Sequence, residues 1–396
     1  MAGSGPHGLI RMLSAKTAVI LGGGVGGLVA ATRLRRSLPS HHRVVLVERE
    51  SNHLFQPSLL WLAIGARRPE AIQRSVAGLA GAGIDVVRAE IEQIDGANRI
   101  VVAQGQRLPA DALIVALGAD LAPEAVPGLA AAGHDLYTQQ GAVSIRDAIA
   151  KFNGGRVVVL TATPAYKCPA APYEAAMLIE HALRQRGVRA QSQLDLYAAE
   201  SAPMGVTGPL VSSAVRQIVE QKGIGYHPEH QVVAVDPVAR RITFANGVAA
   251  EFDLLIYVPP HRAPAVVRQA GLAAEGGWVS VDRATLATPF PGVFAIGDVT
   301  SIPLAMGKPL PKAGVFAHAQ AEVVAANLAA EWTGRGAGRA FDGQGQCFLE
   351  TGGGRAGLGS GDFYAEPTPR IRLRGPSPWW HWGKVLFERR WLSGRF

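Results

Sequence analysis

The chain has little cysteine: its 396 residues include two, Cys168 and Cys347, which lie far apart in the sequence. Neither belongs to a C-x-x-C pair, so the spacing excludes zinc-binding and thioredoxin-like motifs, and we predict no metal site. Long apolar runs are also lacking. None reaches the roughly 18 residues that span a bilayer, so we expect no transmembrane helix. The stretch before Ala15 lacks the apolar segment of a secretory signal, and Met12 is a candidate start.

Acidic side chains are scarce in residues 370–396, which contain seven Lys or Arg and a single Glu, or +6 of a net charge of +8. The same segment contains four of the seven tryptophans and two phenylalanines. Cationic and aromatic side chains together favour an anionic membrane surface, with the rings at headgroup depth. A helical tail packed on its own protein is the alternative interpretation. No nucleic-acid-binding motif accompanies these residues, so we expect no nucleic-acid partner.

A dinucleotide-binding pattern occupies residues 18–48. A β-branched strand leads into Gly22, Gly24 and Gly27, a helix follows, and a second strand ends at Glu48. In this pattern the first glycine makes a tight turn, the second lets backbone approach a pyrophosphate, and the third lets the helix sit close to the strand. The phosphate then lies at the helix N-terminus, and Glu48 can accept hydrogen bonds from ribose hydroxyls. An ordinary glycine turn would leave Glu48 unexplained.

Two further strands end in small residues and indicate that the dinucleotide is FAD. Residues 293–298 form an apolar strand that ends in Gly297 and Asp298, and Asp298 can reach ribityl or pyrophosphate groups at the carboxyl end of the sheet. Residues 111–119 form another buried strand, which is closed by Gly118. The order of these elements resembles flavoproteins of the pyridine nucleotide-disulfide reductase type. That resemblance implies an α/β fold with two Rossmann-like dinucleotide-binding folds.

The second of these folds is expected to be inserted into the first. We predict a discontinuous FAD-binding domain at residues 12–150 and 280–335, a second and degenerate nucleotide-binding domain at 151–279, and a C-terminal helical, membrane-facing region at 336–396. In the inserted fold, the turn after the strand at 156–160 contains three prolines and no glycine, so it offers a pyrophosphate no cradle. We therefore expect neither NADH nor NADPH as the electron donor.

Cys168 lies in this turn. Lys167 precedes it, and a helix with Glu174 in its first turn follows it. A helix N-terminus and a neighbouring ammonium group both stabilise a thiolate, which is the form that a nucleophilic sulfur requires. We therefore predict a reactive Cys168 with a stabilised thiolate, and the alternative is a buried and inert cysteine.

Four segments together resemble the sulfide:quinone oxidoreductase family: Cys168-Pro-Ala-Ala-Pro-Tyr-Glu174, Val258-Pro-Pro-His261, Lys308-Pro-Leu-Pro-Lys312-Ala-Gly314 and Cys347-Phe-Leu-Glu350. The match extends over nearly the whole chain. The resemblance implies that Cys168 and Cys347 approach each other on one face of the flavin, as a disulfide or bridged by extra sulfur. It also implies a flavoenzyme that oxidises sulfide, or a related thiol or persulfide, and passes two electrons to a membrane quinone.

The resemblance also implies roles for residues around the sulfur chemistry. Cys168 and Cys347 would be the redox sulfurs, and Glu174 and His261 would carry protons. Each of the last two has a plainer alternative. Glu174 could be a first-turn residue that offsets the helix dipole, and His261 could be a loop histidine without a role.

Further implied roles concern the flavin and the quinone. Lys312 opens a long helix whose start would face the pyrimidine end of the flavin, where the lysine and the helix dipole stabilise an anionic reduced ring. Phe348, Lys384 and Phe387 would form the quinone site. The alternatives are a solvated loop cation for Lys312 and core aromatics for the two phenylalanines.

The chain departs from the family in two respects. It lacks a third cysteine early in the second fold, and it lacks the cysteine near the first helix through which some members attach flavin, so we expect non-covalent FAD. The glycine-rich residues 355–361 are expected to form only a flexible turn. We expect a peripheral membrane protein on the cytoplasmic side, and the oligomeric state stays open, a homo-oligomer included.

Three other functions stay open from the sequence. The first is the flavoprotein subunit of a flavocytochrome c sulfide dehydrogenase, which would need export. The second is an NADH:quinone-type flavin oxidoreductase, which the proline-rich turn disfavours. The third is a flavin-binding sensor or scaffold, which would have no reason to keep two cysteines and a basic, aromatic tail.

Overall fold

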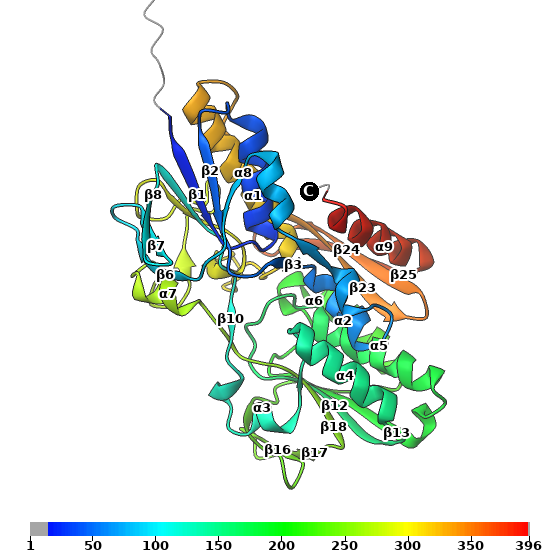
Figure 1. The fold of residues 1–396 in the computed structure, drawn as a ribbon. Coiled ribbons are helices and arrows are strands. Elements are labelled where there is room, and N and C mark those ends of the chain that lie inside the picture. The colour runs from blue at the N-terminus through cyan, green and yellow to red at the C-terminus, as the bar shows by residue number, and fades with distance from the viewer. Residues whose placement is uncertain (1–14, 395–396) are drawn as a thin grey trace, which may run out of the picture.

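A computed structural model describes residues 15–394 of the chain, and the candidate start at Met12 lies outside them. Two five-stranded parallel sheets organise the molecule (Figure 1). The first sheet has the strand order β21-β9-β1-β2-β5. Its strands are β1 (Thr17–Leu21), β2 (Arg43–Val47), β5 (Asp85–Val87), β9 (Ala112–Val115) and β21 (Val293–Ala295). Their continuous apolar runs are typical of strands that are covered on both faces.

Helices cover one face of the first sheet and a small sheet covers the other. Helices α1 (Val25–Ser37) and α8 (Gly314–Thr333) pack on each other and bury one shared cluster with the strands (Figure 1). Alanine-rich α8 has high helix propensity, and it ends at Gly334 in a left-handed conformation. On the opposite face lie α7 (Ala265–Gln269) and the antiparallel strands β6 (Ile91–Asp95), β7 (Ile100–Ala103) and β8 (Gln106–Pro109).

The second sheet repeats the strand order of the first, β11-β18-β12-β13-β14. Its strands are β11 (His134–Asp135), β12 (Gly155–Thr161), β13 (Ser192–Tyr197), β14 (Gly225–His227) and β18 (Leu254–Val258). Strand β18 lies beside β12 as β9 lies beside β1, which is the duplication that the sequence predicted. The predicted α/β class with two Rossmann-like folds is therefore confirmed.

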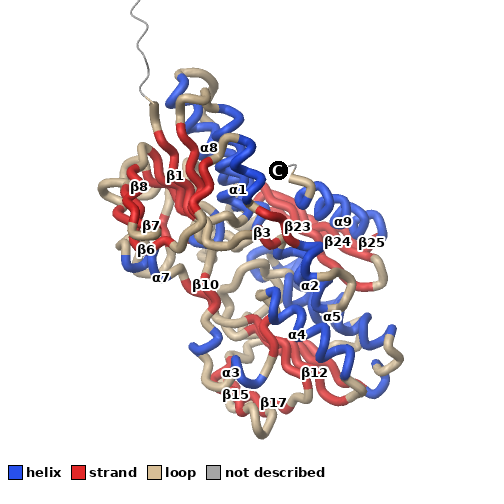
Figure 2. The backbone as a smooth tube through the Cα atoms, in the orientation of Figure 1, coloured by secondary structure: helices blue, strands red, loops and turns tan. Residues whose placement is uncertain are grey.

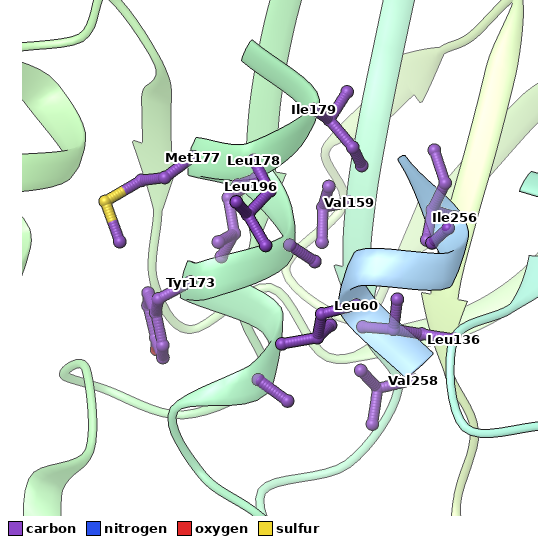
Figure 3. Close-up of a cluster of buried hydrophobic side chains, with 14 of the residues drawn as sticks. Leu60, Leu136, Val159, Tyr173, Met177, Leu178, Ile179, Leu196, Ile256 and Val258 are labelled. Atoms are coloured by element: carbon purple, nitrogen blue, oxygen red, sulfur yellow. The ribbon is translucent and has the colours of Figure 1, made fainter. Parts of the chain in front are cut away.

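The main hydrophobic core lies on one face of this second sheet. Helices α2 (Leu59–Ala63), α4 (Gln139–Lys151), α5 (Ala171–Gln185) and α6 (Pro209–Glu220) cover it. Figure 3 shows Leu60 of α2 and Leu178 and Ile179 of α5 close to Val159, Leu196 and Ile256 of the sheet. The other face is covered by α3 (Leu129–Ala132) and the strands β15 (Val232–Asp236), β16 (Arg241–Phe244) and β17 (Ala249–Glu251).

Three two-stranded pairs complete the strands outside the C-terminal region: β3 (Asn52–Leu54) with β4 (Gln73–Ser75), β10 (Asp120–Leu121) with β19 (His261–Arg262), and β20 (Val279–Ser280) with β22 (Thr300–Ser301). The pair β10–β19 lies where the chain passes between the two large sheets (Figure 1). In the part of the chain that the structure describes, no helix combines the length and the apolar character needed to cross a bilayer.

The C-terminal region is an antiparallel sheet followed by one helix. The sheet contains β23 (Gln344–Gly352), β24 (Arg355–Asp362) and β25 (Arg370–Ser377), and the helix is α9 (Pro378–Leu392). Strand β23 lies against α5, and β24 lies against α9 (Figure 2). The flexible turn predicted at residues 355–361 is wrong, because these residues form β24. Glycine alternates there with Ala356 and Leu358, and a Cβ at Gly361 would overlap the carbonyl oxygen of Arg370.

Helix α9 is held against residues 53–67 by buried polar contacts. The carboxylate of Glu388 accepts hydrogen bonds from Ser58 and, at 2.7 Å, from Nη2 of Arg67. Trp391 Nε1 donates to His53 Nε2 at 2.9 Å, and His53 Nδ1 lies 2.9 Å from the carbonyl oxygen of Gly23. Because the indole can only donate, His53 must carry its proton on Nδ1. The imidazole therefore connects α9 to the glycine loop in its neutral form.

The contact through His53 predicts an acid-sensitive stability. Burial lowers the pKa of His53, the hydrogen bond to Gly23 opposes this, and Arg74 adds to it. Because the folded-state pKa lies below the unfolded value of about 6.5, the contribution is present above pH 6.5 and is lost as pH falls below it. We expect the free energy of unfolding to fall less steeply between pH 7 and pH 5 in His53→Gln than in the unmodified chain. Equal slopes in chemical denaturation would contradict this account.

Candidate active site

The glycine loop after β1 has the geometry of a phosphate cradle. Gly22 has φ +97°, and a Cβ there would lie 2.6 Å from the carbonyl oxygen of Ala116. A Cβ at Gly27 would overlap the carbonyl oxygen of Gly22. A Cβ at Gly24 would meet no atom of residues 15–394 within 4 Å, apart from its sequence neighbours. Gly22 and Gly27 are thus required by the fold, whereas Gly24 leaves space at the start of α1.

Glu48 lies beside this loop at the end of β2. Its carboxylate accepts hydrogen bonds from the backbone N–H of Gly23 and, at 2.8 Å, from that of Glu50. Gly118 follows β9 at the same edge of the sheet with φ +69°, and a Cβ there would meet no atom of the described chain within 4 Å. The ribose contact predicted for Glu48 stays a prediction.

Asp298 and Lys312 lie together after β21 and before α8. Lys312 Nζ donates to the carbonyl oxygens of Asp298 at 2.7 Å and Thr300 at 2.8 Å, and it lies 3.4 Å from the ring centroid of Trp278. Burial lowers the pKa of Lys312 to about 8, and Asp298 opposes the shift. Lys312 is therefore not a solvated loop cation, which was the alternative to its predicted role.

Several features of this edge fit FAD. A Cβ at Gly314 would lie 3.5 Å from Val25, so the N-termini of α1 and α8 are neighbours. Their N-cap residues, Gly24 and Ala313, have no side chain that could cap the free N–H groups. Asp298 Oδ1 is buried and finds no hydrogen-bond partner within residues 15–394. An uncapped helix start beside an open glycine suits a pyrophosphate, and an unpartnered carboxylate oxygen suits a ligand hydroxyl.

The two cysteines meet beside this edge. Cys168 precedes α5, and its backbone N–H donates to the carbonyl oxygen of Lys312 at 2.6 Å. Cys347 lies on β23, both cysteines pack against the same hydrophobic core, and their thiols are close enough to interact electrostatically. Both are free thiols, and Cys347 Sγ also lies 3.3 Å from the carbonyl oxygen of Phe348. Cys168 has φ +49°, a left-handed conformation that is uncommon outside glycine and often marks functional sites.

The thiolate stabilisation predicted for Cys168 is wrong for this dithiol form. The hydrogen bond with Cys347 is the largest cause that raises the pKa of Cys168 well above its ordinary value, and burial and the charge of Glu174 add to it. Lys384 opposes the shift. Lys167, the expected partner, is buried itself, and its charge interacts first with Asp298. Sequence proximity alone could not show that a second thiol would lie beside the first.

Beneath the cysteines lies a buried network of charged groups. Lys384 Nζ of α9 donates to Glu174 Oε1 of α5 at 3.0 Å, and the backbone N–H of Glu350 donates to the same oxygen at 2.8 Å. The side chains of Lys384 and Glu174 are 6% and 3% exposed. Glu350 in turn contacts His381 at 3.1 Å. Neither Glu350 nor His381 has a role predicted from the sequence, although Glu350 follows Cys347 by three residues.

His261 lies on the other side of the cysteine turn, where its ring meets that of Tyr137 edge-on at 5.3 Å. Its Nδ1 bonds to the carbonyl oxygen of Pro259 at 2.8 Å, and its Nε2 is buried with no hydrogen-bond partner in the described chain. Burial, helped by Lys167, lowers the pKa of His261 to about 3. His261 is therefore a neutral hydrogen-bond acceptor at neutral pH. Tyr137 donates to the carbonyl oxygen of Lys167 and so holds the turn in place.

The residues predicted to contact the quinone lie on two elements. Phe348 belongs to β23, and Lys384 and Phe387 belong to α9. Side chains alternate along a strand, so Phe348 faces the opposite side of β23 from Cys347. A Cβ at Gly383 would lie 3.3 Å from Phe348, which places this ring against α9 next to Lys384. Phe387 is 43% exposed, and its ring lies 5.5 Å from that of Phe55. Lys384 is the buried member of the three.

The corresponding edge of the second sheet is filled by protein side chains. Glu200 follows β13 as Glu48 follows β2, but it accepts hydrogen bonds from Thr161 at 2.7 Å, from Tyr173 at 2.7 Å and from Tyr166. Both tyrosines are buried. The carboxylate that a nucleotide ribose would use is thus engaged internally. Within residues 15–394, no three His, Cys, Asp or Glu side chains are grouped so as to hold a metal ion.

Comparison with known proteins identifies relatives along nearly the whole chain. The sequence profile described as pyridine nucleotide-disulphide oxidoreductase matches residues 16–321. The chain is 28% identical over 403 residues to the sulfide-quinone reductase of Aquifex aeolicus, covering 96% of this chain and 90% of the relative. It is 25% identical over 363 residues to the mitochondrial sulfide:quinone oxidoreductase of Mus musculus, covering 88% and 78%.

A solved structure agrees with the sequence relatives. The crystal structure of the sulfide:quinone oxidoreductase of Aquifex aeolicus superposes with a TM-score of 0.87 at 26% identity, covering 96% of this chain and 91% of that one. The resemblance indicated by the four sequence segments is confirmed by these relatives.

Proposed function

The chain belongs to the pyridine nucleotide-disulphide oxidoreductase family, and from this premise we propose that it is a flavoenzyme that oxidises sulfide and delivers two electrons to a membrane quinone. A related thiol or persulfide is included in the substrate class. The relatives named for this reaction support the proposal over most of the chain. The observation that carries it is the contact between the thiols of Cys168 and Cys347, which are 179 residues apart in the sequence.

In the proposed reaction the resting enzyme holds Cys168 and Cys347 as a disulfide. Hydrosulfide attacks one sulfur, the S–S bond breaks, and one cysteine becomes a persulfide while the other leaves as a thiolate. A second sulfur nucleophile then removes the outer sulfur, so that the pair has gained two electrons. Bound FAD supplies the redox chemistry that carries these electrons from the cysteines to the quinone.

The charged residues beneath the pair assist the departing sulfur. The ammonium of Lys384 opposes the rise in the pKa of Cys168, and its own interaction with Cys347 is attractive when that sulfur is a thiolate. Glu174 fixes the ammonium at 3.0 Å. His261 contributes a neutral acceptor at Nε2 on the far side of the turn. We propose that Glu174 and His261 receive and return protons at these atoms, and that His261 holds a proton only transiently because its pKa is lowered to about 3.

We propose that the FAD is non-covalent and lies along the edge of the first sheet. The loop of Gly22, Gly24 and Gly27 and the start of α1 would hold the pyrophosphate, with Glu48 at the ribose. Asp298, Gly118 and Gly297 would line the middle of the cofactor, and Lys312 would face its pyrimidine end. The division into a discontinuous FAD-binding domain, an inserted fold and a C-terminal region forms part of this proposal.

We propose that Phe348, Lys384 and Phe387 form the quinone site and that α9 rests on a membrane surface. Trp379, Trp382 and Leu386 of α9 are 80%, 61% and 67% exposed. They recur along one side of the helix, as expected for an interfacial anchor. On β25 the alternate residues Arg370, Arg372 and Arg374 are exposed as well and would meet anionic headgroups. We further propose a peripheral position on the cytoplasmic side of the membrane.

Mixing the protein with sulfide under anaerobic conditions tests the proposed function. We expect sulfide to bleach the flavin absorbance and decylubiquinone to restore it. NADH should leave the absorbance unchanged, because Glu200, Tyr166 and Tyr173 fill the second nucleotide edge. Bleaching by NADH but not by sulfide would overturn the proposal and favour an NADH:quinone-type oxidoreductase. Reoxidation by a cytochrome c but not by the quinone would favour a sulfide dehydrogenase subunit.

Alanine substitutions in the glycine loop separate flavin binding from folding. Gly24→Ala meets open space and has φ −70°, so we expect the free energy of unfolding of the apoprotein to change by less than about 0.5 kcal/mol. Its methyl group would enter the proposed phosphate cradle, and we expect bound flavin to fall at least about tenfold. Gly27→Ala forces a backbone overlap and should lose both fold and flavin. Full flavin retention by Gly24→Ala, measured by absorbance after desalting, would contradict the assignment.

A further inference from the structure

The buried charges between α5, β23 and α9 form a connected series that ends at the protein surface. Glu174 lies next to the cysteines and contacts Lys384 at 3.0 Å. Glu350 interacts electrostatically with both of these residues, and both of its carboxylate oxygens lie 3.1 Å from Nδ1 of His381. The side chain of His381 is 24% exposed, whereas that of Glu350 is 1% exposed. The series therefore has one end at the reacting sulfurs and the other at solvent.

The charge balance of the series favours the uptake of a proton. Two buried carboxylates, Glu174 and Glu350, share one buried ammonium, that of Lys384. Buried charges are costly unless they are paired, so one negative charge is left for a neighbour to balance. Burial raises the pKa of Glu350, Lys384 opposes the shift, and Glu174 adds to it. A proton on either Glu350 or His381 neutralises the whole series.

His381 is the member of this series that reaches the protein surface, and aromatic rings lie on both sides of it. Its ring meets Trp61 of α2 at 5.8 Å and Trp382 of α9 at 6.2 Å. Arg67 and Lys384 both lie over the Trp61 indole, at 4.4 Å and 5.0 Å from the ring centroid. The charged groups next to this part of α9 are therefore Glu350, Lys384 and Arg67, and Arg67 is paired with Glu388 at 2.7 Å. The rings of Trp61 and Trp382 restrict the orientation of the His381 imidazole, and its Nδ1 faces Glu350.

We propose that His381 and Glu350 form the entry route by which protons from solvent reach the quinone site. This inference rests on the proposed function, because reduction of a quinone to a quinol takes up two protons with the two electrons that sulfide supplies. The imidazolium of His381 gives its proton to Glu350, which leaves a neutral imidazole and a carboxylic acid. The acid re-protonates the Lys384 and Glu174 pair after that pair has given a proton to the quinone, and solvent returns a proton to His381.

The two residues are positioning and relay groups that act through Lys384 and Glu174. Glu350→Gln keeps the shape of the side chain and the backbone N–H bond to Glu174, but it cannot carry a proton as a carboxylic acid. His381→Ala removes the surface group and leaves a space that free imidazole can enter. His227→Gln is the matched control, because His227 contacts Asp195 at 3.0 Å as a histidine–carboxylate pair on the second sheet, outside this series.

Stopped-flow measurement of the two half-reactions tests the inference. We expect reduction by sulfide to stay within about twofold of the unmodified enzyme in Glu350→Gln and His381→Ala. Reoxidation by decylubiquinone should slow about 10²-fold in both, the range typical of lost proton transfer. Added imidazole should restore reoxidation in His381→Ala but not in Glu350→Gln, and His227→Gln should match the unmodified enzyme in both half-reactions.

Other results would overturn the inference. Reoxidation at the unmodified rate in both variants would show that protons enter elsewhere. A slow reoxidation that imidazole does not restore in His381→Ala, together with lost flavin or altered unfolding, would assign His381 a structural role. Failure of the unmodified enzyme to be reduced by sulfide or reoxidised by quinone would instead refute the proposed function itself, so the two failures are distinguishable.

Discussion

Replacing Cys168 with Ser is expected to abolish reduction of the flavin by sulfide, by at least about 10³-fold in rate, while the flavin stays bound. Serine nearly keeps the size of the side chain at this position, where φ is +49°. Its oxygen cannot form the disulfide that hydrosulfide attacks. Anaerobic stopped-flow absorbance measures the rate, and the spectrum of the desalted protein measures the bound flavin.

The same reasoning predicts how the two cysteines combine. If Cys168 and Cys347 act as one redox unit, Cys347→Ser should lose as much activity as Cys168→Ser. The double variant should then be no worse than either single variant, because residues that act as a unit are strongly non-additive. Reduction of Cys168→Ser by sulfide at the rate of the unmodified protein would remove the basis of the cysteine mechanism.

Replacing Lys384 with Met is expected to have the second large effect, on stability and on reoxidation by quinone. The substitution leaves the carboxylates of Glu174 and Glu350 buried without their ammonium partner. Removing one partner of a buried ion pair costs about 3–5 kcal/mol, because the other charge stays buried and uncompensated. Chemical denaturation of the apoprotein measures the loss of unfolding free energy, and decylubiquinone reoxidation measures the functional loss.

A double variant separates the charge effect from simple loss of packing. Lys384→Met combined with Glu174→Gln removes both charges, and we expect it to recover more than half of the lost stability. Reoxidation should stay slow in this double variant, since neither group can then deliver a proton. Equal instability of the single and double variants would show that the methylene packing of Lys384, rather than its charge, holds α9 against α5.

The sequence predicted most of the large sheets and little of the C-terminal sheet. Strands β1, β9 and β12 are continuous apolar runs that end in turns, so pattern alone located them. Strand β24 was not predicted, because glycine occupies every second position from Gly357 to Gly361 and that composition is typical of turns. At Gly357 and Gly361 the backbone of β25 leaves little or no room for a Cβ, and only the assembled sheet reveals this.

The site was predicted in part, and the failures have a common cause. The glycine loop and Glu48 follow from spacing along a short segment. The contact between Cys168 and Cys347 was implied only by the family resemblance, since it joins the inserted fold to the C-terminal sheet. The raised pKa of Cys168 arises from that same long-range contact and from burial, so a local rule about helix N-termini gave the wrong sign. The contact between Glu350 and His381 forms only where β23 packs near α9, so the sequence could not indicate it.

Peptide mapping of the oxidised, flavin-loaded protein under non-reducing conditions shows directly whether Cys168 and Cys347 form one redox pair. We expect the peptides with Cys168 and Cys347 to be joined, through a disulfide or with extra sulfur, and we expect sulfide followed by sulfite to convert both cysteines to alkylatable thiols. Two thiols that react with iodoacetamide before any reductant is added, in a protein that still transfers electrons from sulfide to quinone, would contradict it.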